Sequence, residues 1–223
     1  MSRFDLREIP PAPDLRFEAE LWQAGLTLVA GIDEAGRGAW AGPVTAAAVV
    51  LPCNQMDLTM QLRGVRDSKQ MTALQRERCA GLIRAAAISW AVGWAAQTEI
   101  DTLGILPATR LAMRRAIEAL AVIPEHLLVD AVRLPEIALG QTALIKGDAR
   151  ALSIAAAAVL AKTARDAWMR SLDEQFPGYG FAAHKGYGTA AHQRALDTLG
   201  PCAEHRASYA PVQRAIFFRQ AEA

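Results

Sequence analysis

Four acidic residues stand where carboxylates could act together: Asp33, Glu34, Asp130 and Asp148. The first two end one short apolar stretch, the third ends another, and the fourth precedes a long alanine-rich segment. In α/β folds, ligand sites lie at strand ends on one edge of the sheet, so these acids could converge there. Converging acids repel one another unless cations are bound, and carboxylate oxygens suit Mg²⁺ or Mn²⁺. The alternative is that each acid only caps a helix or faces solvent, and composition does not decide between the two.

A glycine-rich turn follows the first pair of acids in the segment "GIDEAGRGAWAGP". Gly36 and Gly38 would let backbone N–H groups approach a phosphate closely, and Arg37 offers a planar fork of donors. Lys69, in "DSK", could be a further phosphate contact. An ordinary tight turn and an exposed loop lysine are the alternatives.

The elements that must position these residues can be predicted from hydrophobic periodicity. Apolar or alternating stretches predict strands over residues 27–33, 44–51, 88–94 and 126–132. Helical spacing of apolar residues predicts helices over residues 72–86, 106–120 and 151–168. The last of these is apolar on nearly every side as far as Lys162, which indicates a central, tightly packed helix. The order of elements predicts an α/β domain with a mixed sheet.

Composition limits the class of protein. A chain of 223 residues that is 52% hydrophobic and 21% charged can form one domain, or one domain with a small appendage. The net charge of +1 gives no global basic field, so any attraction to phosphate must be local. The cysteines, Cys53, Cys79 and Cys202, lack paired spacing, and no apolar run is long enough for a membrane span. A soluble cytoplasmic protein with reduced cysteines is therefore expected.

Five segments, in this order and at these separations, resemble bacterial type 2 ribonuclease H (ribonuclease HII). They are "GIDEAGRGAWAGPV", "DSKQMT", "LLVDAV", "KGDARALSIAAAAVLAKTARD" and "HKGYGTAAH". The resemblance spans roughly residues 20–215. It implies an α/β ribonuclease H-like fold, with a five-stranded mixed sheet flanked by helices and a small C-terminal helical extension. Residues 1–25, with the proline-rich "IPPAPDL" and mixed charges, suit an N-terminal arm; a catalytic domain (26–200) and a tail packed on that domain (201–223) would follow.

The resemblance also assigns roles to residues. The catalytic, metal-binding acids would be Asp33, Glu34, Asp130 and Asp148, holding two divalent ions, Mg²⁺ or Mn²⁺. Substrate contacts would come from Gly36, Arg37, Gly38, Lys69 and Tyr187, and supporting roles from Asp166, His184 and Lys185. An ordinary helix-face ion pair with Lys162 or Arg170 explains Asp166 equally well. The tail has Tyr209 and Gln213 where the family commonly has phenylalanine and a basic residue.

The implied activity is hydrolysis that needs no protein nucleophile. It would cut the RNA strand of RNA/DNA hybrids, or the 5′ side of a ribonucleotide embedded in duplex DNA, leaving 5′-phosphate and 3′-hydroxyl ends. Selection of RNA must rest on the 2′-hydroxyl, which backbone amides of residues 36–38 are suited to recognise. The protein would act as a monomer, away from membranes, in removing ribonucleotides from DNA.

Two alternatives remain open at this stage. One is a different metal nuclease or strand transferase on the same fold, which would lack the "GRG" and "KGYG" elements. The other is a non-catalytic module that binds nucleic acid. Of the four histidines only His184 is expected near substrate, and the five tryptophans are predicted to be packing residues.

Overall fold

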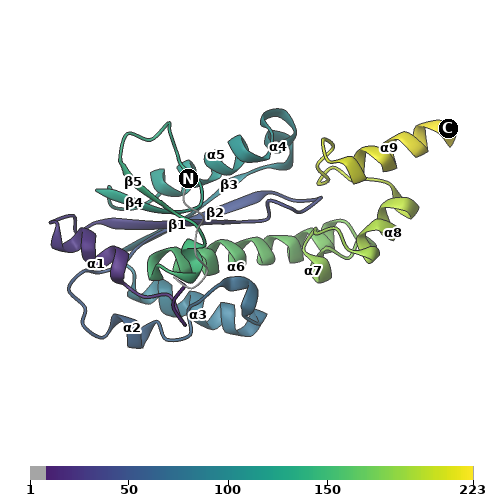
Figure 1. Ribbon diagram of the computed structural model, residues 1–223. Coiled ribbons are helices and arrows are strands. Elements are labelled where there is room, and N and C mark those ends of the chain that lie inside the picture. Colours follow the sequence, from purple (N-terminus) through teal and green to yellow (C-terminus); the bar gives the residue numbers. More distant parts are fainter. Residues whose placement is uncertain (1–8, 223) are drawn as a thin grey trace.

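A five-stranded mixed sheet forms the centre of the protein (Figure 1). The structure is a computed structural model that describes residues 9–222, with side chains as far as Phe217. The strands are β1 (Val29–Ala35), β2 (Val44–Val50), β3 (Ser89–Ala95), β4 (His126–Asp130) and β5 (Gly140–Leu144), in the order β3-β2-β1-β4-β5. β2 is antiparallel to β1 and β3, whereas β4 runs parallel to β1 and β5. The predicted mixed sheet is confirmed.

Helices cover both faces of this sheet. They are α1 (Arg16–Gln23), α2 (Leu58–Gln61), α3 (Ala73–Ala86), α4 (Gln97–Leu103), α5 (Ile105–Glu118), α6 (Leu152–Gln175), α7 (Phe181–His184), α8 (Ala190–Leu199) and α9 (Ala210–Glu222). Short 3₁₀ turns, η2 and η3, occupy Ser68–Gln70 and Gly147–Ala149. α6 and α3 lie on one face and α5 on the other, while α7, α8 and α9 extend beyond the end of the sheet (Figure 1). The predicted C-terminal helical extension is thus present.

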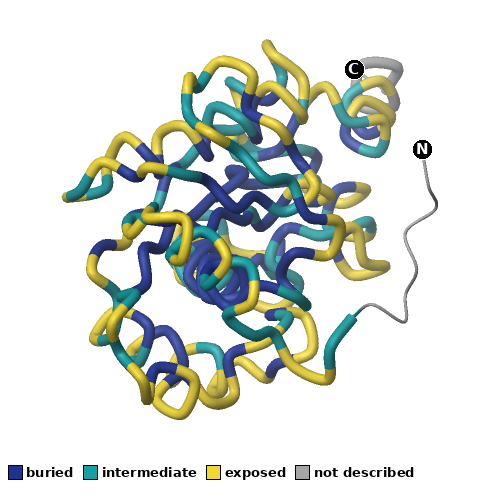
Figure 2. Tube along the Cα trace, turned by 60° about the vertical axis from the view of Figure 1, so that its left-hand side comes forward, coloured by how far each residue is buried: buried dark blue, intermediate teal, exposed yellow. Residues whose placement is uncertain are grey.

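The central helix α6 is the element that fixes the site. Its first ten residues, 152–161, are all buried, as the apolar pattern predicts. Figure 2 shows buried positions gathered in the inner strands and in this helix. Contact with β1 is so close that a Cβ on Gly31 would lie 2.2 Å from the carbonyl carbon of Ser153. The start of α6, just after Asp148, is therefore held firmly against the strand that carries Asp33.

Three features differ from the expectations of periodicity. β5 was not predicted from its own pattern, because it mixes polar and half-buried positions at the sheet edge. α4 was not predicted either, and α6 continues to Gln175. In β3 the small residues face the more buried side, since a Cβ on Gly93 would lie 2.1 Å from Ala112 O of α5. The tryptophans of β3 consequently lie on its less buried side.

The N-terminal segment is tied to the domain by backbone hydrogen bonds of Asp14 and by one buried acid. The predicted arm (1–25) lies partly outside the described residues, and its described part contains α1. Glu18 of α1 is fully buried and accepts a hydrogen bond from Ser153 N at 2.8 Å. This contact places a carboxylate at the N-terminus of α6, where the helix dipole favours negative charge. Among residues 9–222, no helix is long and apolar enough to cross a membrane.

Candidate active site

The four predicted acids lie at neighbouring strand ends. Asp33 and Glu34 are near the end of β1, and Asp130 is the last residue of β4, which pairs with β1 in parallel, with Ile32 opposite Val129. Asp148 lies in η3, between β5 and α6. The parallel pairing thus puts Asp130 beside Asp33, and the close packing of α6 on β1 brings in Asp148.

Hydrogen bonds orient these carboxylates. Asp33 Oδ1 accepts a bond from Glu34 N at 2.6 Å, and Asp130 Oδ1 accepts one from Gly147 N at 2.7 Å. The second bond links the end of β4 directly to the turn that carries Asp148. Each acid keeps a further oxygen for another partner, which a metal site requires.

Burial and mutual repulsion shift the pKa values of the four acids upward. Burial, followed by the charges of Glu34, Asp130 and Asp148, holds the pKa of Asp33 well above its usual range. Burial and the neighbouring carboxylates raise the pKa of Asp130 to about 6, against the opposing effects of the Gly147 N–H and Lys69. Burial also raises the pKa values of Glu34 and Asp148. Ionising all four acids together is therefore unfavourable unless a cation is bound.

The chemistry of the cluster fits a divalent cation. Glu34 Oε2 is buried without a hydrogen-bond partner, so an acceptor oxygen in the cluster is left unsatisfied. Buried charges are normally paired or bound to metals, and oxygen-only ligands suit Mg²⁺ or Mn²⁺. Within residues 9–222, however, no three His, Cys, Asp or Glu side chains lie close enough together to hold a metal ion as they stand. The four acids are near enough to repel, and a bound cation would have to draw them together.

Two basic residues border the cluster. Lys69 Nζ lies 3.9 Å from Asp148 Oδ2, and its side chain is 81% exposed. Burial lowers the pKa of Lys69, but the nearby carboxylates outweigh this effect and raise it. Arg37 Nη1 lies 3.2 Å from Glu34 Oε1. Both cations can therefore reach an incoming anion at the edge of the acidic cluster.

The predicted glycine turn directs its carbonyl groups inward. Gly36 has φ +94°, and a Cβ there would lie 2.0 Å from Arg165 Nε, so both the backbone conformation and the space require glycine. The carbonyl oxygens of Gly36 and Arg37 accept hydrogen bonds from Arg206 at 2.7 and 2.9 Å. In the described part of the chain, the N–H groups of Arg37 and Gly38 have no hydrogen-bond partner. Two donors are thus left for a ligand.

Two buried arginines that sequence reasoning missed hold this region together. Arg206 also donates to Gly42 O, and Arg165 donates to Ala41 O and Pro43 O and to Lys185 O. Both side chains are fully buried, and none of their described contacts is an ion pair. Burial lowers the pKa of Arg165 to about 10. Their role is to bind backbone carbonyls, which joins the glycine turn to the loop that follows α7.

Tyr209, in the tail, also binds the glycine turn. Its hydroxyl accepts a hydrogen bond from Arg206 Nη1 at 3.0 Å and donates one to Arg37 O at 2.8 Å. A phenylalanine could make neither bond. The tyrosine therefore adds a second clamp on the glycine turn.

The "KGYG" loop lies beside the glycine turn, as the predicted site requires. Ala39 and Tyr187 form an isolated antiparallel bridge, and Trp40 N donates to Gly186 O at 2.8 Å. The Tyr187 ring lies 5.3 Å from both Lys162 Nζ and the Arg165 guanidinium carbon. The turn and the tyrosine are thus brought together from positions about 150 residues apart.

Two hydrogen-bonded histidines, His192 and His205, stabilise the backbone of this loop. Cys202 N donates to His205 Nδ1 and His192 Nδ1 lies beside Tyr187 O, both at 3.0 Å, so each ring has one assigned tautomer. His205 Nε2–H then donates to His192 Nε2 at 3.0 Å. Burial lowers the pKa of each of these two residues to about 4. This chain of neutral imidazoles fixes the Tyr187 backbone.

The residues predicted to support the site have mostly structural contacts. His184 Nε2 bonds Tyr179 O at 2.8 Å and its Nδ1 accepts from Gly186 N at 3.1 Å, so both ring nitrogens are engaged within the loop. Lys185 Nζ donates to Ala182 O. Asp166 is paired with Lys162 at 2.6 Å, and with Arg76 at 3.0 Å rather than with Arg170. Asp166 thus ties α6 to α3 through these two cations. No described hydrogen bond or ion pair links it to the four-acid cluster.

Comparison with known proteins identifies similar sequences over most of the chain. The sequence model of the family described as "Ribonuclease HII" matches residues 30–212. "Ribonuclease HII" of Myxococcus xanthus is 53% identical over 91% of this chain and 68% of its own length. That of Chloroflexus aurantiacus is 54% identical over 92% of this chain and 96% of its own length.

Solved structures share the fold. The ribonuclease H2 of Pyrococcus horikoshii has a TM-score of 0.71 at 24% identity, covering 86% of this chain and 99% of its own. The structure titled Bst-RNase HIII in complex with Mn²⁺ has a TM-score of 0.64 at 20% identity, covering 99% of this chain and 77% of its own. These similarities confirm the ribonuclease H-like fold.

Proposed function

Because the chain belongs to the ribonuclease HII family of metal-dependent endoribonucleases, we propose that it cuts 5′ of ribonucleotides embedded in duplex DNA and cleaves the RNA strand of RNA/DNA hybrids. The proposal includes 5′-phosphate and 3′-hydroxyl products. It also includes a role in removing ribonucleotides from DNA.

One observation supports this choice of substrate above the others. The glycine turn leaves the N–H groups of Arg37 and Gly38 without partners, while Arg206 holds the carbonyls of the same turn from behind. Such donors suit a sugar hydroxyl or a phosphate oxygen, and the 2′-hydroxyl is what distinguishes RNA from DNA at one position. The turn directly follows Asp33 and Glu34, so recognition of the ribose and hydrolysis of its phosphate would take place side by side.

The acids would hold the divalent ions. Asp33, Glu34, Asp130 and Asp148 supply only oxygen ligands, and the manganese bound in the solved ribonuclease HIII supports Mn²⁺ as well as Mg²⁺. Two bound divalent ions would activate water and stabilise the leaving 3′-oxygen. Arg37 and Lys69 would orient the substrate phosphates, and no side chain of the cluster has to act as a nucleophile.

A panel of three labelled duplexes tests this proposal. The substrates are duplex DNA with one ribonucleotide, a continuous RNA/DNA hybrid, and all-DNA duplex, each incubated with Mg²⁺ or with a chelator. Cleavage of the first two in Mg²⁺ alone is expected. Cleavage of all-DNA duplex would favour a different nuclease on this fold, and binding without cleavage would favour a non-catalytic module.

Lys69 is expected to contribute affinity without sequence preference. Replacing Lys69 by Ala should weaken binding similarly for all substrate sequences and lower the slope of log affinity against log salt by about one phosphate contact. The reason is that its ammonium is largely exposed at the edge of the cluster. Binding titrations at several salt concentrations measure this slope. An unchanged slope would mean that Lys69 does not contact phosphate.

Tyr187 is expected to discriminate the junction between ribonucleotide and deoxyribonucleotide. Its ring borders the glycine turn, and a flat aromatic face packs better on a deoxyribose than on a sugar whose 2′-hydroxyl must be desolvated. Tyr187→Ala should therefore reduce kcat/KM more for a single embedded ribonucleotide than for a continuous hybrid. Tyr187→Phe, which keeps the ring, is the matched control and should have a mild effect. Equal losses on both substrates would leave Tyr187 with a structural role only.

The proposed setting is a monomer in the cytoplasm. All three cysteines are free, which supports a reducing compartment. Light scattering of the purified protein at micromolar concentration should give the mass of one chain. A dimer mass would require a different account of the substrate-binding face.

A further inference from the structure

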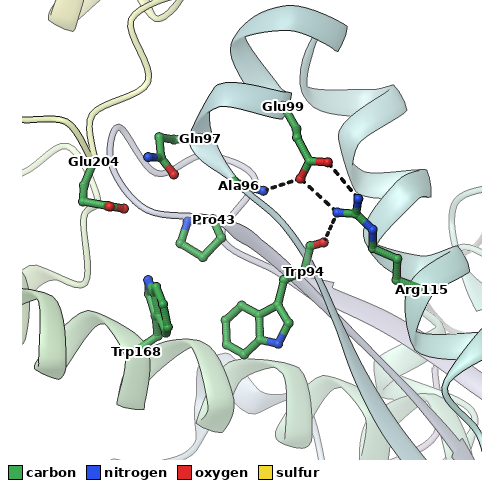
Figure 3. A pocket seen from close by; sticks show the side chains of 8 residues that line it. All are labelled: Pro43, Trp94, Ala96, Gln97, Glu99, Arg115, Trp168 and Glu204. Carbon is green, nitrogen blue, oxygen red and sulfur yellow. Dashed lines mark hydrogen bonds and ion pairs between the residues drawn. The ribbon is translucent and has the colours of Figure 1, made fainter.

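A second candidate site lies away from the acidic cluster, in a cavity of about 600 Å³ (Figure 3). It lies between the end of β3, the start of α4, the middle of the 202–206 loop, and one side each of α5 and α6. Its main wall residues are Trp94, Gln97, Glu99, Arg115, Trp168 and Glu204. A cavity of this size and an apolar lining with a few polar groups are typical of ligand sites.

Two indole rings form the apolar wall. The rings of Trp94 and Trp168 lie 5.8 Å apart, tilted by 47°. Trp168 is 45% exposed, although tryptophans were predicted to be packing residues. Trp40 does pack, against His192 at 5.3 Å. The Trp94–Trp168 pair therefore keeps aromatic surface available to a ligand.

Two of the charged residues of the cavity form an ion pair with each other, and the third is a carboxylate without a cation. Arg115 makes two hydrogen bonds to the Glu99 carboxylate, at 2.8 and 2.9 Å, and a third to Trp94 O. This cation is therefore already neutralised. Glu204 faces the cavity from the opposite side (Figure 3), and no hydrogen bond or ion pair of its carboxylate is found in the described part of the chain. Burial raises the pKa of Glu204, as expected for a carboxylate that lacks a cation.

The polar groups of the cavity that lack a partner favour a ligand that donates hydrogen bonds. Gln97 Nε2 is engaged with Ala203 O at 3.0 Å, which leaves the amide oxygen as an acceptor. Apart from the indole N–H groups, the cavity thus offers acceptors, one negative charge and two aromatic faces. A phosphate would be repelled by Glu204, which makes nucleic acid a poor occupant. A planar cation with several N–H donors matches all three features, because guanidinium groups stack on aromatic rings and bind carboxylates bidentately.

We propose that this cavity binds an arginine side chain presented by a partner protein, stacked on Trp168 and Trp94 and paired with Glu204. The cavity is larger than one guanidinium group, so residues that flank the arginine would fill the remainder. The proposal does not depend on the nuclease assignment, since no residue of the acidic cluster lines the cavity.

Binding of blocked tripeptides to the full-length protein tests the proposal. The probes are Ala-Arg-Ala, its neutral citrulline isostere and Ala-Lys-Ala, followed through the indole N–H signals of ¹⁵N-labelled protein. The arginine peptide should shift the Trp94 and Trp168 signals saturably, with a Kd at least ~10-fold lower than that of the citrulline peptide, in keeping with the loss of one charged contact. The lysine peptide should bind between the two, because it carries the charge without the planar stack.

Two variants separate charge from shape. Glu204→Gln should reduce arginine binding to the citrulline level and leave citrulline binding unchanged, whereas Trp168→Ala should weaken both. Glu118→Gln, which alters an exposed carboxylate on α5 outside the cavity, is the matched control and should change neither. Equal binding of arginine and citrulline peptides, unaltered arginine binding by Glu204→Gln, or absence of any shift would overturn the proposal. A short single-stranded DNA that shifts the same signals more strongly would overturn it in favour of nucleic acid.

Discussion

Replacing Asp130 by Asn is expected to abolish cleavage and to make the metal-free protein more stable. The variant loses one anionic oxygen from a site that must neutralise divalent charge, which should lower the rate by at least ~10³-fold. Asn can still accept the hydrogen bond from Gly147 N, so the local fold should survive. Asp33→Asn should behave in the same way. Single-turnover cleavage in Mg²⁺ measures the loss, and a near wild-type rate for either variant would contradict the metal assignment.

The gain in stability from Asp130→Asn should increase with pH. Burial and neighbouring carboxylates raise the pKa of Asp130 to about 6 in the folded protein, from 3.8, so folding favours the protonated form. Below about pH 4 Asp130 is protonated in both the folded and the unfolded state and costs no stability. The loss of folding free energy grows as pH rises and is complete above about pH 6. At pH 7.5 Asp130→Asn should therefore raise the free energy of unfolding by roughly 1–3 kcal/mol. Thermal melts without metal at pH 4 and 7.5 should show the gain only at the higher pH.

The second large effect is expected at Arg206, although it touches none of the acids. Arg206→Met should lower the free energy of unfolding by about 3–5 kcal/mol, because three backbone carbonyls lose charged hydrogen bonds at a buried position. Activity should fall as well, since the carbonyls of Gly36 and Arg37 would keep only the neutral hydrogen bonds from Ala39 N and the Tyr209 hydroxyl. Chemical denaturation measures the first effect and kcat/KM on the ribonucleotide-containing duplex measures the second.

Two further variants make this prediction specific. Arg206→Lys keeps the charge but cannot reach three carbonyls with a planar fork, so it should recover part of the stability and little of the activity. Arg114→Met removes an exposed arginine whose partner, Glu118, is 3.7 Å away, and it should cost at most about 1 kcal/mol. If Arg206→Lys were as active as the wild type, the arginine would not position the glycine turn.

Sequence reasoning could find the acids because their positions follow from local pattern. An apolar strand that ends in a carboxylate can be recognised from a few residues, and the rule for strand ends then brings Asp33 and Asp130 to one edge. The central place of α6 follows in the same way from its apolar faces. Both features depend on sequence neighbours.

The two buried arginines could not be found in this way. Arg165 bonds Pro43 O and Arg206 bonds Gly36 O, across 122 and 170 residues of sequence. An arginine in a sequence is normally expected to be exposed, and its acceptors here are carbonyls, which every residue has. β5 was missed for a related reason, because an edge strand that is half-buried carries little hydrophobic pattern. The arginine-selective cavity likewise depends on elements brought together only by the fold.

Binding of Mn²⁺ to the wild type and to Asp130→Asn, followed by the electron paramagnetic resonance signal of free Mn²⁺, tests the central claim most directly. The matched control is Asp197→Asn, which removes an exposed carboxylate on α8. The four-acid site predicts that the wild type and Asp197→Asn bind Mn²⁺ with equal affinity, and that Asp130→Asn binds it at least ~10-fold more weakly. Equal Mn²⁺ affinity in all three proteins would contradict the assignment of Asp33, Glu34, Asp130 and Asp148 as the metal site.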